Sequence, residues 1–247
     1  MNQTLEFLGE CFSSRLKITG NVHVWYLDVS LIVDISSYLL FLDQEETHQS
    51  SKIQHPVARK RFVLCRSIRK ILIATYSGIS VKELIIVANR FEKPFIKHNP
   101  SGLQFSSSYA GVYLAIAFST AGATGIDIVE KKTISESDQL ANWYFHPEER
   151  QYLKELLPAH ADLAFLKLWA CKESVAKALG YGITKPGFLE SFNCARIVQT
   201  GEQQTVNAEG KSLIVSPVGL SELLFDAVAV EGRWGIIEKY SLYPKFL

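Results

Sequence analysis

The sequence predicts an α+β fold, a pseudo-dimer of two similar α+β subdomains, each a small antiparallel sheet with a long helix, with the functional site at their interface. Two helical patterns carry this prediction, Arg61–Ile79 and Ala164–Ile183, because they match one another weakly and each has glycine near its end. Each half also has a compact apolar strand. We expect residues 1–120 and 121–247 to form the two subdomains. Since the repeat already supplies two halves, we expect a monomer.

The composition is that of an ordinary globular protein. Of the 247 residues, 47% are hydrophobic and 21% charged, and the formal net charge is +1. This balance gives no reason to expect nucleic acid or a membrane as a partner. The cysteines, Cys11, Cys65, Cys171 and Cys194, form no CxxC pair, which weakens a zinc site and favours reduced thiols in the cytoplasm. The first 14 residues have no long apolar run, so we predict no signal peptide.

An uncharged stretch, Ser101–Ile126, needs a separate explanation. Glycine, serine and threonine interrupt it, and its apolar core, Val112–Phe118, is shorter than the roughly 20 residues that a membrane helix needs. We therefore expect a buried strand. The three serines and the tyrosine before that core indicate either an anion-binding nest at a strand–turn junction or simple turn chemistry.

The first half contains a strand signal in Asn21–Ile35, an acidic loop or short helix in Leu39–Ser51, and a long helix from Pro56 to Gly78. The long helix is basic and has no acidic residue. A solvated basic face is the usual explanation, but the missing acidic partners favour a face that binds phosphate. Its basic residues are Arg59, Lys60, Arg61, Arg66, Arg69 and Lys70.

The second half presents a carboxylate in an apolar strand. Asp127 lies in the middle of Thr124–Glu130, and a buried aspartate needs a hydrogen bond, a cation or a metal as a partner. After the helix that follows, the tail from Phe188 to Tyr243 is predicted to be mainly strands.

The helix Leu166–Ile183 carries three charged residues of interest. Lys172 falls in the apolar sector, and Glu173 and Lys177 form an i, i+4 pair at its edge. One interpretation is an amphipathic helix with a surface ion pair and a Lys172 side chain that extends to solvent. The other is that these residues frame an anionic ligand, with a metal on Glu173.

Three segments together resemble the Sfp-type 4′-phosphopantetheinyl transferases: Gly125–Glu130 (GIDIVE), Phe145–Leu153 (FHPEERQYL) and Trp169–Ile183 (WACKESVAKALGYGI). The signature of that family is Gly, Ile or Val, then Asp, followed further on by W-x-x-K-E-x-x-x-K. Upstream, the basic helix resembles the family's basic helix, Lys93-Pro94 its Gly-Lys-Pro turn, and Phe105–Gly111 its Phe-Asn-x-Ser-His turn.

The resemblance implies transfer of 4′-phosphopantetheine from coenzyme A to a serine of an apo acyl, peptidyl or aryl carrier protein, with release of 3′,5′-ADP. It assigns Asp127 and Glu173 as ligands of Mg²⁺, with Mn²⁺ as the alternative ion, and Asp127, Glu173 and Lys177 as catalytic residues. The residues that it implies for coenzyme A contacts are Arg59, Arg66, Arg69, Lys93, Ser108, Tyr109 and Lys172.

The chain departs from the family pattern at three positions. Val129 replaces a second acid, and Glu130 follows it, on the face of the strand opposite Asp127, so we expect Glu130 outside the metal shell. Tyr109 replaces a histidine and Glu92 replaces a glycine. These departures motivate an alternative function, a catalytically impaired module of the same fold that binds coenzyme A or a carrier protein.

One further acid, Glu149, also matches the family. It corresponds to an acid near the metal, but it fits equally well as a first-turn residue of a helix. The sequence leaves both interpretations open.

Overall fold

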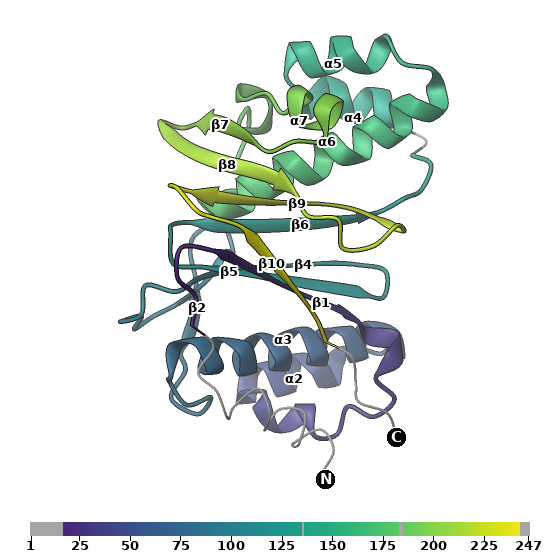
Figure 1. The fold of residues 1–247 in the computed structure, drawn as a ribbon. Helices are drawn as coiled ribbons and strands as arrows, with labels where there is room; N and C mark the ends of the chain where they lie inside the picture. Colours follow the sequence, from purple (N-terminus) through teal and green to yellow (C-terminus); the bar gives the residue numbers. More distant parts are fainter. Residues whose placement is uncertain (1–16, 135, 183–184, 243–247) are drawn as a thin grey trace.

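The computed structural model describes residues 17–134, 136–182 and 185–242. The residues considered above as a signal peptide, together with Cys11 and Ile183, lie outside this part of the chain. The fold is a mixed α+β fold, which confirms the predicted class at that level. Figure 1 shows the layers: two four-stranded sheets face each other in the middle, and helices cover their outer faces.

The first sheet has the strand order β10-β1-β5-β4, and its neighbours are antiparallel except for β1 and β10. Its strands are β1 (Val22–Asp28), β4 (Gln104–Ala110), β5 (Tyr113–Ser119) and β10 (Ile237–Ser241). The second sheet is antiparallel, in the order β6-β9-β8-β7. Its strands are β6 (Thr124–Glu130), β7 (Gln204–Ala208), β8 (Lys211–Pro217) and β9 (Leu224–Glu231). A hairpin of β2 (Ile86–Ala88) and β3 (Pro94–Ile96) stands apart from both sheets.

The two long helices have matching ends. Helix α3 (Pro56–Ser77) and helix α6 (Pro158–Leu179) each begin with proline, which has the backbone angle that a first helical turn needs. Each is followed by a glycine in the left-handed conformation, Gly78 at φ 73° and Gly180 at φ 75°. The predicted glycine stops are therefore confirmed, although α6 begins at Pro158, well before Leu166.

Acidic partners of the basic helix α3 come from another helix. In α2 (Gln44–Lys52) and its N-cap, Glu46 and Asp43 accept hydrogen bonds from Lys70, and the Arg69 guanidinium lies 4.0 Å from Glu46. Part of the positive charge of α3 is thus neutralised within the fold. The helix itself has no acidic residue, but Arg69 and Lys70 find acidic partners on α2 and its N-cap.

The serine-rich segment before β5 is a strand and not a turn. Ser106, Ser107 and Ser108 all lie within β4, in register with β5, and the turn comes later, at Gly111 (φ 53°). Neither the anion nest nor the turn that we considered for these serines is present. On the face of β4 toward the second sheet, the hydroxyls of Ser106 and Ser108 accept the backbone N–H groups of Ile126 and Ile128.

The tail of the chain is less regular than predicted. It contains the short 3₁₀ helix Leu189–Ser191 and helix α7 (Ala195–Thr200) before β7. Its last strand, β10, returns to the first sheet and pairs in parallel with β1. A boundary between residues 120 and 121 therefore separates the strands of the first sheet from those of the second. The exception is β10, which follows this boundary in the sequence but belongs to the first sheet. The remaining helices, α4 (Ser137–Tyr144) and α5 (Pro147–Lys154), lie beside α6 (Figure 1).

Three apolar cores hold the layers together. One lies between α3 and the first sheet, and another between α6 and the second sheet. The third lies between the sheets and is made of small and β-branched side chains, which allow close approach: Val22, Val24, Ala115, Ala117, Ile126, Ile128, Val228 and Val230. The uncharged stretch contributes β5 to this core, as a buried strand.

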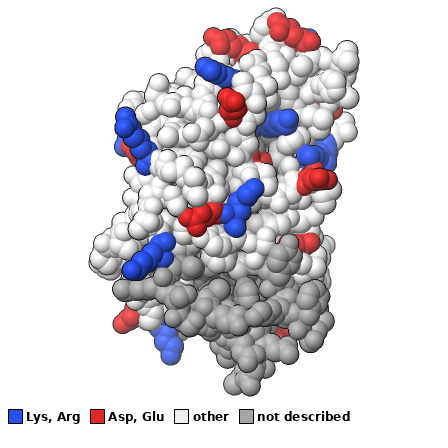
Figure 2. Space-filling view, in the orientation of Figure 1, with Lys and Arg blue, Asp and Glu red and all other residues white. Residues whose placement is uncertain are grey.

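The surface carries mixed charge. Figure 2 shows one face on which basic and acidic side chains are interspersed, in agreement with the net charge of +1. Across residues 17–134, 136–182 and 185–242, every helix is too short or too polar to cross a bilayer.

Candidate active site

The candidate site begins where α6 lies directly on β6. Gly125 makes this contact feasible, because a Cβ atom there would lie 2.0 Å from the Ser174 carbonyl oxygen and 2.3 Å from the Ala178 nitrogen. Any larger residue would push the helix away from the strand. Asp127, two residues further along β6, therefore faces the last two turns of the helix.

Asp127 is buried and bound by two side chains. Its Oδ1 atom accepts a hydrogen bond of 2.6 Å from Lys177 Nζ and one of 2.8 Å from Ser108 Oγ. The Ser108 hydroxyl also accepts from Lys177 Nζ at 3.0 Å and from the Ile128 N–H at 3.3 Å. Ser108 comes from the first sheet and the other two side chains from β6 and α6, so both halves of the chain contribute to the site.

Glu173 lies one turn before Lys177 and is only 8% exposed. Its Oε1 atom is buried and has no hydrogen-bond partner among residues 17–134, 136–182 and 185–242. Burial, together with the negative charge of Asp127, raises the pKa of Glu173 to about 7, while Lys177 opposes this rise. When Glu173 is ionised, the nearby ammonium of Lys177 is already bonded to Asp127, so a bound cation would supply the further positive charge that two carboxylates need.

The two carboxylates fit a hard divalent cation. In the described part of the chain, no group of three or more His, Cys, Asp or Glu residues is placed to hold a metal. Mg²⁺ does not need such a cage, because it keeps several waters and is commonly bound through one or two carboxylates and substrate phosphates. Asp127 and the unpartnered Oε1 atom of Glu173 match that ligand set.

Glu130 lies on the other face of β6, as predicted. Val129 packs with the apolar core under α6, on the same face as Asp127. Glu130 instead lies against Gly111 in the β4–β5 turn, where a Cβ atom on the glycine would be 1.9 Å from its Oε1 atom. The position of the family's second acid is thus apolar here.

Lys172 does not join this group. Its side chain is fully buried, and its ammonium donates to Glu149 Oε1 at 3.0 Å and to the Phe192 carbonyl at 2.7 Å. Glu149 is also fully buried and accepts the backbone N–H groups of Cys194 and His146. We therefore correct the assignment of Lys172 as a coenzyme A contact, since the pair joins α6 to α5 and α7. Glu149 has the helix-start role that was one of its two interpretations.

The arginines of α3 lie on the opposite side of β4 from Ser108. Strand alternation turns Phe105, Ser107 and Tyr109 toward α3, and the Arg69 guanidinium lies 5.8 Å from the Phe105 ring. Arg61, which we did not select from the sequence, stacks over the Tyr109 ring at 4.3 Å. The sequence signal that could have identified Arg61 is the alternation of side chains along β4. Ser108 and Tyr109 are consecutive residues of this strand, so they cannot both face the same ligand surface.

Arg59, Arg66 and Arg69 differ in how they are held. The Nε atoms of Arg59 and Arg69 are buried and have no hydrogen-bond partner within the described part of the chain, and Arg66 lies over Phe62 at 5.4 Å. Burial lowers the pKa of Arg69, with the positive charge of Arg66 adding to that effect. A guanidinium group with a free N–H donor is suited to an anionic ligand, although Arg69 also lies 4.0 Å from Glu46.

Lys93 lies apart from these arginines. It donates to two backbone carbonyls, of Ala178 at 2.6 Å and of Thr124 at 3.2 Å. Its neighbour Glu92 has φ 65°, a left-handed conformation that glycine adopts more readily. This explains why glycine suits that position in the Gly-Lys-Pro turn of the family.

Comparison with known proteins finds one family to which part of the chain is similar. Residues 123–216 match the family model described as the 4′-phosphopantetheinyl transferase superfamily. The 4′-phosphopantetheinyl transferase HetI of Nostoc sp. is 26% identical over 174 residues, which cover 68% of this chain and 72% of that protein. The 4′-phosphopantetheinyl transferase gsp of Aneurinibacillus migulanus is 32% identical over 120 residues, 48% of this chain and 47% of the relative. Residues 123–216 of the chain are thus similar to the 4′-phosphopantetheinyl transferase superfamily.

This match confirms the predicted family and enzyme class. The part of the chain that matches the superfamily model includes Gly125, Asp127, Glu173 and Lys177, and excludes the arginines of α3. A solved structure of the holo-acyl-carrier-protein synthase of Thermotoga maritima covers 45% of this chain and 63% of its own, with 17% identity and a TM-score of 0.30. At that score, the description of the fold stands on the strands and helices of this chain alone.

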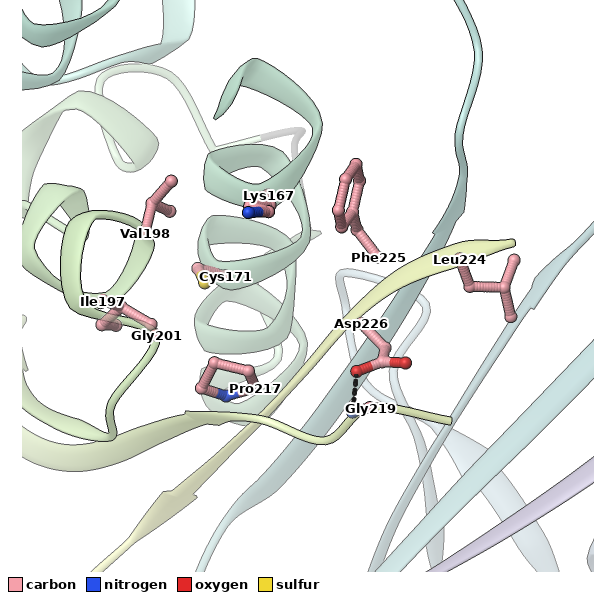
Figure 3. Close-up of a pocket in the computed structure, with 10 residues that line it drawn as sticks. All are labelled: Lys167, Cys171, Ile197, Val198, Gly201, Pro217, Gly219, Leu224, Phe225 and Asp226. Atoms are coloured by element: carbon pink, nitrogen blue, oxygen red, sulfur yellow. Dashed lines mark hydrogen bonds between the residues drawn. The ribbon is translucent and has the colours of Figure 1, made fainter. Parts of the chain in front are cut away.

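A separate hollow lies on the second half of the chain (Figure 3). It is a cavity of about 170 Å³ between α6, α7 and the ends of β8 and β9. It shares no residue with the Asp127 group. Its acid, Asp226, is occupied by the backbone N–H groups of Val218, Gly219 and Leu220. The lining residues are Lys167, Cys171, Ile197, Val198, Gly201, Pro217, Gly219, Leu224, Phe225 and Asp226.

Proposed function

We propose that this protein transfers 4′-phosphopantetheine from coenzyme A to the serine hydroxyl of an apo carrier protein, and releases 3′,5′-ADP. The observation that carries the proposal is the convergence of Asp127, Glu173 and Lys177 at the contact of β6 with α6. The site has two buried carboxylates, Asp127 and Glu173, and the ammonium of Lys177, and the Oε1 atom of Glu173 has no partner among the described residues. This set of groups suits the binding of a metal and a pyrophosphate.

Asp127 and Glu173 would hold the divalent cation, Mg²⁺ in our proposal. When bound, such a cation neutralises the pyrophosphate of coenzyme A and makes its phosphorus a better electrophile. The serine oxygen of the carrier forms the new bond to the phosphorus of the transferred group. The bond from that phosphorus to the bridging oxygen breaks, and 3′,5′-ADP leaves with the oxygen.

The side chains of this protein have separate tasks in that reaction. Glu173, whose pKa is raised to about 7, is our candidate to accept the serine proton, directly or through a water. Lys177 would stabilise the charge that develops on the leaving phosphate. Ser108, whose hydroxyl is already bonded to Asp127, Lys177 and Ile128, would orient Asp127, in place of the phosphate contact that the resemblance implies.

The nucleotide end of coenzyme A would lie on the α3 side of β4. There, the stacked pair of Arg61 and Tyr109 offers a guanidinium and a ring edge, and Arg59 and Arg66 add positive charge. A ligand that contacts both this pair and Asp127 has to reach around β4, because Ser108 and Tyr109 point to opposite faces of the strand. We propose Arg61 as an additional phosphate contact, because its guanidinium lies over Tyr109 on the α3 side of β4.

The pseudo-dimer remains part of the proposal. Each half has a 22-residue helix over a four-stranded sheet, although the sheet of the first half takes its fourth strand, β10, from the second half. In each half the strand before the helix (β1 or β6) pairs antiparallel with a later strand of the same half (β5 or β9). We propose that the two halves are structural repeats, that the active site lies between them, and that the protein acts as a cytoplasmic monomer.

Mass spectrometry of a carrier protein tests this function. An apo acyl or peptidyl carrier protein is incubated with this protein, coenzyme A and Mg²⁺, with an EDTA control. We expect the carrier to gain the mass of one phosphopantetheine group, and EDTA to abolish the gain. No gain on several carrier types, despite measurable binding of coenzyme A, would favour the alternative of an impaired binding module.

A further inference from the structure

The end of helix α6 is closed by residues from the other half of the chain. The last carbonyls of a helix have no partner within the helix. Here the N–H groups of Gly180 and Tyr181 bond to the carbonyls of Lys177 and Ala176, which is the Schellman arrangement. Two of the carbonyls that follow, those of Ala178 and Gly180, accept hydrogen bonds from a loop of the first half.

That loop is Asn89–Lys93, between β2 and β3, which we call the cap loop. Lys93 Nζ donates to the Ala178 carbonyl at 2.6 Å, and Asn89 Nδ2 donates to the Gly180 carbonyl at 3.0 Å. The loop holds its own shape, because Asn89 Oδ1 accepts the N–H groups of Phe91 and Lys93. It is seated closely, since a Cβ atom on Gly180 would lie 2.7 Å from Asn89 Nδ2.

The Lys93 ammonium also reaches the strand that carries Asp127. It donates to the carbonyl of Thr124, the first residue of β6, at 3.2 Å. One ammonium thus joins the end of α6 to the start of β6. It does so next to Gly125, where the helix and the strand are in closest contact.

We propose that Lys93 is a positioning residue that fixes the last turn of α6 against β6, and so sets Lys177 and Glu173 in place around Asp127. Lys177 immediately precedes Ala178, so a shift of that turn would move its Nζ atom away from Asp127 Oδ1. This inference rests on the proposed function. It replaces the phosphate contact that the resemblance implies for Lys93.

The surroundings of Lys93 support this role. The amine of Lys93 lies against the two carbonyls and away from water, and this burial lowers the pKa of Lys93 to about 8. A lysine that binds phosphate from solvent needs its Nζ atom free, whereas here the amine is already bonded to two carbonyls.

Steady-state kinetics of three variants test the inference. Lys93→Met removes the donors at similar length, Lys93→Arg keeps donors, and Lys97→Met removes an exposed lysine from the same hairpin as a control. We expect Lys93→Met to lower kcat by about tenfold or more, because small displacements of catalytic groups are costly, and to leave KM for coenzyme A within about twofold. Lys93→Arg should recover part of kcat, and Lys97→Met should match the wild type.

The opposite pattern would overturn the inference. A phosphate contact predicts that Lys93→Met raises KM for coenzyme A while kcat stays near the wild-type value. Unchanged kcat and KM would overturn it as well. If Lys93→Met does not fold, Lys93→Gln, which retains one short donor, is measured in its place with the same criteria.

A second measurement separates this inference from the proposed function. Hydrogen exchange of the peptide 174–182 reports the stability of the last turn of α6 and needs no activity. We expect faster exchange in Lys93→Met than in the wild type or Lys97→Met. Unchanged exchange would refute the positioning role even in an active enzyme. Faster exchange in a protein that transfers nothing would uphold the role of Lys93 in fixing α6 and reject only the function.

Discussion

Lys177 Nζ lies 2.6 Å from Asp127 Oδ1, so an ammonium from α6 already pairs with the carboxylate of β6. Glu173, one turn earlier on the same helix, shares this environment but has a buried oxygen without a partner. One positive charge therefore serves two buried carboxylates. The imbalance is the physical reason to expect a cation here, and it determines how the variants below should behave.

Removing the charge of Lys177 should affect the chemical step more than binding. In our proposal this ammonium stabilises charge that develops on the leaving phosphate, so we expect Lys177→Met to lower kcat by about two orders of magnitude. KM for coenzyme A should change much less. Steady-state kinetics measure both, with Lys167→Met, an exposed lysine of the same helix, as the control. Unchanged turnover would mean that Lys177 is only half of an ion pair.

Glu173 should make the stability of the metal-free protein depend on pH. Its pKa is raised from 4.5 to about 7, so over this interval the folded state keeps a proton that the unfolded state releases. The free energy of unfolding therefore falls as pH rises from 4.5 to about 7, and the loss persists at higher pH. A shift of this size corresponds to a loss of about 3 kcal/mol.

Urea unfolding in EDTA at several pH values measures this effect. The wild type should lose stability relative to Glu173→Gln as pH rises, because the glutamine does not ionise. Equal slopes against pH in the two proteins would show that Glu173 is not held in the environment described here.

The buried pair of Lys172 and Glu149 should matter for stability and not for coenzyme A binding. Lys172→Met leaves the Glu149 carboxylate buried without its cation, so we expect a loss of about 3–5 kcal/mol in the free energy of unfolding. The double variant Lys172→Met/Glu149→Gln should lose less, because the uncompensated charge is gone. Chemical denaturation gives both values. A small loss in stability together with weaker coenzyme A binding would restore Lys172 as a ligand contact.

Glu92 occupies a position where glycine is favourable. Its φ of 65° costs a residue with a side chain about 1 kcal/mol, which glycine avoids. We expect Glu92→Gly to raise the free energy of unfolding by a few tenths of a kcal/mol to about 1 kcal/mol, after the greater flexibility of the unfolded chain is counted. Thermal unfolding measures the change, and a clear loss of stability would contradict the assigned backbone conformation.

The sequence was sufficient for the features that depend on local rules. The helix ends at Gly78 and Gly180 follow from backbone preferences. The burial of Asp127 follows from the apolar strand around it. Glu130 lies one residue beyond the position of the family's second acid. Because side chains alternate along a strand, this shift predicts that Glu130 faces away from Asp127.

The partners of the charged residues could not be predicted in the same way. The helical pattern placed Lys172 in an apolar sector and so required an anion, but Glu149 lies on another helix and only the tertiary fold joins them. For the same reason Arg69 and Lys70 had acidic partners on α2 that a search along their own helix could not find. Serine is common in turns, so the three serines of β4 concealed the alternation of Ser108 and Tyr109.

The central claim is that Asp127 and Glu173 together form the metal and catalytic centre of a phosphopantetheinyl transferase. The most direct test is the initial rate of mass gain on an apo carrier protein for the wild type, Asp127→Ala, Glu173→Ala and Glu130→Gln, at saturating coenzyme A and Mg²⁺. Glu130 is the matched control, since it lies on the same strand and faces away from the site. We expect both alanine variants to remain folded and lose turnover by orders of magnitude, while Glu130→Gln stays near the wild-type rate. Near-normal turnover in either alanine variant would contradict the account.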